Sequence, residues 1–89
     1  MALKHAQAFE AIDLRPLGEQ LADAPSTSLI KSQHLQLMRV VLRAGESMPE
    51  PHVRGEITLQ CLEGRAAVLT PGRRIELQPG QVTLLPADE

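Results

Sequence analysis

The residues best suited to chemistry lie close together in the middle of the chain, in the segment GESMPEPHVRGEITLQCLEG that begins at Gly45. Glu50 and Glu56 supply carboxylate oxygens, and His52 supplies an imidazole nitrogen. These groups are common ligands of divalent metal ions, and a β-structure could bring three of them to one ion or one small ligand. We therefore predict a metal site at Glu50, His52 and Glu56. The pattern assigns no reaction.

The remaining sequence contains no competing catalytic motif. It has no glycine-rich phosphate loop, no CxxC or HExxH pattern and no nucleophile elbow around a serine. Arg39 is the other candidate, because it interrupts the apolar run LQLMRVVL. Its planar guanidinium could anchor an anionic ligand. It could equally pair with a nearby carboxylate or extend to a strand edge.

Composition narrows the class of protein. The chain has 89 residues and a mass of 9.7 kDa, which fits one small domain. Its 43% apolar and 22% charged residues are typical of a globular chain. Phe9 is the only aromatic residue, so the stacking surfaces of single-strand nucleic-acid binders and sugar binders are missing. A net charge of −2 also disfavours a nucleic-acid partner.

The cysteine content and the hydropathy pattern bear on the compartment. Cys61 is the only cysteine, so the chain cannot form an internal disulfide, and a reducing compartment is expected. No apolar run follows a basic N-terminus as in a signal peptide, and no apolar stretch is long enough to span a membrane. We therefore predict a cytoplasmic protein without a membrane partner. Cys61 itself is expected to be a small, inert apolar side chain.

Residues 1–27 differ from the rest and are predicted to form a flap and linker. Leu14, Leu17 and Leu21 would share one face of a helix, with Asp13 as its cap. A short N-terminal helix or turn is therefore expected before the main domain.

Residues 28–89 are predicted to form an all-β domain. Runs of branched and aliphatic residues indicate short strands, and Pro-Gly dipeptides at 71–72 and 79–80 indicate turns between them. The clearest strand alternates apolar Ile75 and Leu77 with polar neighbours. Short strands at this spacing favour a barrel or a sandwich. The predicted strands span residues 35–42, 57–62, 66–69, 74–78 and 82–85.

This order of residues resembles the cupin superfamily, whose members are small jelly-roll-type β-barrels with two short motifs. The first motif reads Gly, five residues, His-x-His, three or four residues, Glu, six residues, Gly. The residues that follow it here are Gly45, Glu50, His52, Glu56 and Gly64. The second motif begins Gly, five residues, Pro-x-Gly and ends in His, and Gly80 and Pro86 match its start. The resemblance covers about residues 35–86.

The resemblance implies a cupin-like barrel that binds a divalent metal ion, with nickel, zinc, manganese and iron not distinguished. Glu50 stands where the first motif of the family has a histidine. The chain stops at Glu89, before the histidine of the second motif. We therefore expect a barrel that is incomplete at its C-terminal end.

The strand that follows Glu56 should have two unlike faces. Alternation places Glu56, Thr58 and Gln60 on one face and apolar residues on the other. In the cupin geometry the polar face lines the barrel interior. Thr58 and Gln60 would then bind a small ligand together with Arg39, and we predict that this face and His52 point into one cavity. The alternative is that the polar face is the solvated side of a half-exposed sheet.

Two function hypotheses follow. The first is a small cupin-like protein that binds a divalent metal ion or a small polar ligand in its barrel. The second is a non-catalytic, oligomeric β-module that has lost the metal site of the family. An incomplete barrel would expose an unpaired strand edge, so we predict a homodimer. The alternative is that residues 1–25 fold back and cover that edge.

Overall fold

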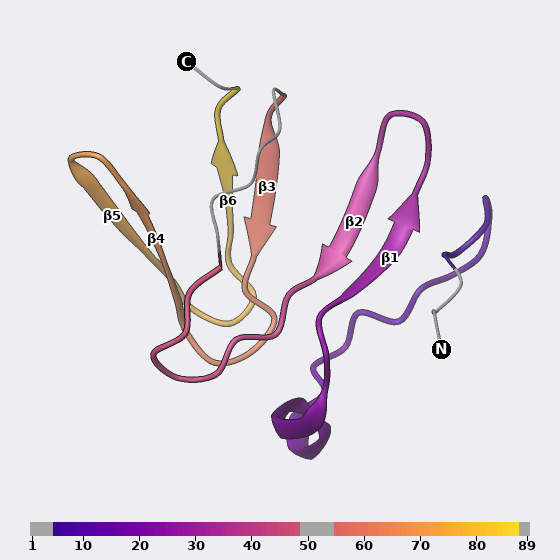
Figure 1. Ribbon diagram of the computed structural model, residues 1–89, viewed down its shortest axis with the longest axis horizontal. Helices are drawn as coiled ribbons and strands as arrows, with labels where there is room; N and C mark the ends of the chain where they lie inside the picture. The colour runs from indigo at the N-terminus through magenta and orange to yellow at the C-terminus, as the bar shows by residue number, and fades with distance from the viewer. Residues whose placement is uncertain (1–4, 49–54, 88–89) are drawn as a thin grey trace. The chain divides into compact units, whose positions relative to one another are not determined.

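The computed structural model describes residues 5–48 and 55–87, which form short β-strands and one 3₁₀ helix (Figure 1). The chain divides into two compact units, residues 1–48 and residues 49–89. The described strands pair antiparallel in three two-stranded sheets, and they do not close into a barrel. The predicted all-β class is therefore confirmed. No helix in these residues has the length and apolar character needed to cross a membrane.

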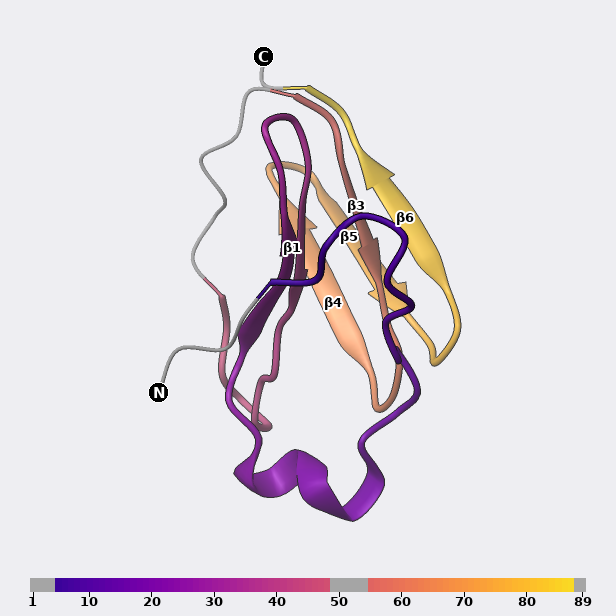
Figure 2. The ribbon, with the colours of Figure 1, turned by 90° about the vertical axis from the view of Figure 1, so that its right-hand side faces the viewer.

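The first unit is a β-hairpin with a short helical turn before it. Figure 2 shows η1 leading upward into β1. The elements are η1 (Gly18–Asp23), β1 (Thr27–Lys31) and β2 (Gln36–Arg39). Thr27 lies opposite Arg39 in the hairpin, and an irregularity between Ser28 and Ile30 shifts the register. The backbone N–H of Ala6 donates to the carbonyl of Leu29, which joins the N-terminal segment to β1.

The helical turn differs from the prediction in its start and in its cap. It begins at Gly18 after Leu17, which makes no side-chain capping bond. Asp13 is not the cap, because its carboxylate accepts hydrogen bonds from Arg15 instead. Pro16 disfavours helical backbone at Arg15, the residue before it, so a helix capped by Asp13 is not formed.

The hairpin strand β2 is shorter than the predicted run of residues 35–42. Beyond Arg39 the backbone leaves the ladder, because the N–H of Val41 donates to the hydroxyl of Ser26 at 2.8 Å. A side chain thus replaces the backbone partner that a longer strand would need.

The second unit contains one strand pair nested inside another. The strands are β3 (Ile57–Gln60), β4 (Ala66–Thr70), β5 (Arg73–Leu77) and β6 (Val82–Leu85). β4 and β5 form a hairpin, whereas β3 pairs with β6 across that hairpin (Figure 1). The predicted turns are present, since Gly72 and Gly80 have φ values of +76° and +87° that favour glycine.

The most buried side chains of the described residues belong to the second unit. Cys61 is 6% exposed and Leu77 is 5% exposed. Along β5 the alternation is as predicted, because Ile75 and Leu77 face inward while Arg74 and Glu76 are exposed. The hydrogen bonds between β3 and β6 continue beyond the end of β3. The backbone N–H of Cys61 donates to the carbonyl of Gln81, and the backbone N–H of Gly80 donates to the carbonyl of Cys61.

Candidate functional site

The predicted metal ligands lie only in part within the described residues. Glu50 and His52 lie outside them. Glu56 is described and is exposed, directly before β3. No cluster of three His, Cys, Asp or Glu side chains is found among residues 5–48 and 55–87, a search that does not include Glu50 and His52.

The face assignment of β3 is corrected by the structure. Thr58 and Gln60 are exposed, while Ile57 and Leu59 on the other face are partly buried. The prediction that the polar face lines the interior is therefore wrong for this strand. The physical reason is that burial of the apolar face is more favourable, and a strand can bury only one face against a single neighbouring layer. The roles of Thr58 and Gln60 as ligand-binding residues stay predictions.

The pairing of β3 with β6 joins the two segments that resemble the cupin motifs, the first around Glu56 and the second from Gly80 to Pro86. Ile57 lies opposite Leu85 in an antiparallel register. Glu56, one residue before β3, therefore stands at the same end of the sheet as Pro86, one residue after β6. Glu56 makes no hydrogen bond or ion pair with another described residue, so its carboxylate is available to a ligand.

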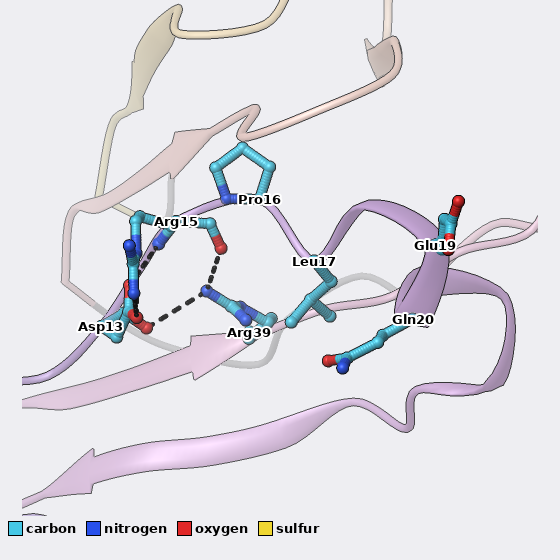
Figure 3. Close-up of a pocket in the computed structure, with 7 residues that line it drawn as sticks. All are labelled: Asp13, Arg15, Pro16, Leu17, Glu19, Gln20 and Arg39. Atoms are coloured by element: carbon cyan, nitrogen blue, oxygen red, sulfur yellow. Dashed lines mark hydrogen bonds and ion pairs between the residues drawn. The ribbon is translucent and has the colours of Figure 1, made fainter.

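Arg39 lies in the first unit, whereas Thr58 and Gln60 lie in the second. Its side chain extends from β2 toward the segment before η1 and lines a cleft of about 610 Å³ (Figure 3). One guanidinium nitrogen, Nη2, donates to the carbonyl oxygen of Asp13 at 3.4 Å and to that of Arg15 at 3.2 Å. The Nε of Arg39 is buried and has no hydrogen-bond partner among the described residues.

Although the sequence named Asp13 and Leu17 as residues of a predicted helix, it assigned no binding role to the other residues of this cleft. They are Asp13, Arg15, Pro16, Leu17, Glu19 and Gln20. They precede β2 by some twenty residues, and only the fold brings them to Arg39. A charged residue inside an otherwise largely apolar run was the available signal, and it indicated Arg39 alone.

Asp13 and Arg15 form a closely bonded ion pair at one end of the cleft. The Nη2 of Arg15 lies 2.7 Å from a carboxylate oxygen of Asp13, and Nε of Arg15 donates to both carboxylate oxygens at 3.0 Å. These side-chain bonds, followed by the bond from the backbone N–H of Arg15, lower the pKa of Asp13 from 3.8 to about 2. The same pairing raises the pKa of Arg15.

We expect Arg15→Gln to return the pKa of Asp13 toward 3.8, because the main stabilising partner of the carboxylate is removed. Since the folded-state pKa is depressed, the pair stabilises the fold above about pH 4 and loses that contribution as the pH falls through about 2. Carbon-13 NMR titration of the Asp13 carboxyl measures the shift. Arg43→Gln is the control and should leave the titration unchanged. A wild-type Asp13 that titrates near 3.8 would contradict the pairing.

A second polar group ties the N-terminal segment to the hairpin. His5 Nε2 lies 2.9 Å from the hydroxyl of Ser28, and the side-chain amide of Gln36 donates to the same hydroxyl at 3.0 Å. The hydroxyl of Ser28 is therefore bonded on two sides. The sequence assigned His5 no role, and its position is explained by this structural contact.

Comparison with models of protein families finds no family that matches the chain. Comparison with curated proteins finds no match either. The functional argument therefore rests on the residues and the geometry described above.

Proposed function

We propose that this protein is a cupin-like binding protein that holds a divalent metal ion or a small polar ligand near the start of β3. The observation that carries this proposal is the pairing of β3 with β6, which sets Glu56 beside the end of the second motif segment. The nested order, with β3 and β6 enclosing the β4–β5 hairpin, also supports a jelly-roll relationship, because a jelly roll is built from strands paired in this way.

The ligand set proposed for the metal is Glu56, His52 and Glu50. Two carboxylates and one neutral imidazole suit zinc, nickel, manganese and iron, and the set does not select among them. Glu56 fits this role because it is exposed and its carboxylate has no partner among the described residues. A bound ion would supply a Lewis acid with positions left for a small polar ligand. No reaction is proposed.

Titration of the metal-free protein with Zn²⁺, Ni²⁺, Mn²⁺ and Fe²⁺ tests the proposal. An ion that binds the folded chain alone should stabilise it by about 2.7 kcal/mol at a concentration one hundred times its Kd. The measurement is the thermal midpoint at each metal concentration, on protein purified without an affinity tag. Absence of a midpoint shift with all four ions, together with substoichiometric metal by mass spectrometry, would contradict metal binding.

A second candidate function is that of a non-catalytic, oligomeric β-module. Each described strand pairs with a single other strand, so one edge of each has no partner strand among the described residues. On the outer face of the β3–β6 sheet, Val82 is 58% exposed and Leu84 is 57% exposed. Unpaired edges beside apolar side chains favour pairing with another chain.

We expect the protein to be a homodimer at micromolar concentration, because a second copy would cover these edges and side chains. Sedimentation equilibrium should then give twice the chain mass of 9.7 kDa. A folded, soluble monomer at 9.7 kDa across the concentration range would contradict the dimer and would favour coverage within one chain.

A further inference from the structure

We propose that Arg39 anchors a site for a small monocarboxylate, and that the backbone oxygens of the strap formed by residues 13–17 occupy its guanidinium until that ligand binds. The site uses residues of the first unit alone, so it goes beyond the metal proposal and can fail separately from it. Three features of the cleft carry the argument.

The first feature is the pair of oxygens on Arg39. Its Nη2 donates to the carbonyls of Asp13 and Arg15 at 3.4 and 3.2 Å, as the dashed lines in Figure 3 show. Both distances are at or beyond the long end for N–H···O bonds, and neutral carbonyls are weaker acceptors for a guanidinium than a carboxylate is. A carboxylate oxygen could therefore replace them with shorter, charge-assisted bonds.

The second feature is the buried Nε of Arg39, which has no acceptor among the described residues. Burial of an unpartnered donor is unfavourable, so a ligand oxygen that accepted a hydrogen bond from Nε would remove this free-energy cost. Nε and Nη2 lie on the same edge of the guanidinium plane. Opening of the strap would present both donors to the two oxygens of one carboxylate, which is the bidentate geometry that arginine favours.

The third feature is the charge around Arg39. The carboxylate of Asp13 is hydrogen-bonded by Arg15 and makes no hydrogen bond to the guanidinium of Arg39, although the charge of Arg39 also contributes to the lowered pKa of Asp13. Gln20 extends its amide to the side of η1 on which Leu17 and Arg39 lie, whereas Glu19 points away from them (Figure 3). The Arg39 guanidinium beside the amide of Gln20 and the apolar side chain of Leu17 suits a single carboxylate on a small apolar body. The nearby charge of Glu19 disfavours a dianion.

Acetate is the probe for the test, with nitrogen-15 NMR of the arginine side chains as the readout. Acetate is titrated into the full chain at constant ionic strength set by sodium chloride. The Nε–H signal of Arg39 should shift and saturate, and the strap amides of Arg15 and Leu17 should exchange faster with solvent. Arg39→Lys keeps the charge but loses the planar fork, so it should weaken acetate binding by about tenfold or more.

Arg43→Lys is the matched control, because Arg43 also donates to a backbone carbonyl, that of Ala22, from an exposed position. It should leave acetate binding unchanged. If Arg39→Lys fails to fold, the Pro16→Gly variant tests the proposal instead. A more flexible strap should open more readily, so this variant should bind acetate more tightly than the wild type. Metal titration should be unchanged by the Arg39 and Pro16 substitutions.

Three results would overturn the proposal. The first is a shift of the Arg39 signal that chloride alone reproduces, which would show ionic screening only. The second is slower exchange of the strap amides in the presence of acetate. The third is equal or weaker acetate binding by the Pro16→Gly variant.

Discussion

Leu77→Ala should lower the free energy of unfolding by about 2–4 kcal/mol, the largest effect expected from a single substitution in the second unit. Leu77 is 5% exposed, and it and Cys61 are the most buried side chains of the described residues. Its truncation removes apolar contact and leaves a cavity that so small a structure can close only in part. Urea unfolding followed by circular dichroism measures the change through the midpoint and the slope.

Leu69→Ala is the matched control for this substitution. Leu69 lies in β4, the strand that pairs with the strand of Leu77, but it is 69% exposed. The same chemical change should therefore cost less than about 0.5 kcal/mol. Equal losses at the two positions would show that the core is not centred on Leu77, and that the outer face of β4 is covered in solution.

His52→Ala should abolish the stabilisation by added metal while leaving the metal-free protein nearly as stable as the wild type. His52 would supply the only nitrogen ligand of the proposed set, and two carboxylates alone bind zinc or nickel weakly. At a metal concentration one hundred times the wild-type Kd, the lost stabilisation is about 2.7 kcal/mol. The measurement is the thermal midpoint with and without metal for both proteins.

His34→Ala is the control for the metal experiment, because His34 is an exposed histidine in the first unit. Its removal should leave the metal-dependent shift unchanged. Glu56→Gln should reduce the shift, whereas Glu76→Gln, at an exposed glutamate of β5, should retain it. If the His52→Ala protein keeps the full metal-dependent shift of the thermal midpoint, the metal binds at another site. If the His34→Ala protein loses that shift, the histidine ligand of the metal is His34 in the β1–β2 hairpin.

Local sequence signals determined the β class, three of the strands and their turns. The alternation of Ile75 and Leu77 with charged neighbours fixes the two faces of β5 without help from the rest of the chain. The Pro-Gly pairs at 71–72 and 79–80 supply a restricted φ followed by a residue that tolerates positive φ. These features depend on neighbouring residues alone, and therefore they can be recognised in the sequence.

The face of β3 and the neighbours of Arg39 could not be determined in this way. β3 alternates polar and apolar residues, so its pattern defines two faces but does not say which one packs against the unit. Only tertiary packing selects the apolar face of Ile57 and Leu59. Likewise, the oxygens that bind Arg39 belong to backbone carbonyls at Asp13 and Arg15, and a carbonyl carries no mark in the sequence.

The sequence by itself therefore determined the β class, three of the strands and the Pro-Gly turns, but not β1 (Thr27–Lys31), and it nominated Glu50, His52 and Glu56 as metal ligands. The tertiary structure decided that β3 pairs with β6 across a hairpin, which sets Glu56 beside the second motif segment. It also decided that the backbone carbonyls of Asp13 and Arg15 accept hydrogen bonds from Arg39. The physical reason is that turn and strand preferences act between adjacent residues. Strand partners and cleft walls are chosen instead by burial and hydrogen bonding between segments far apart in the chain.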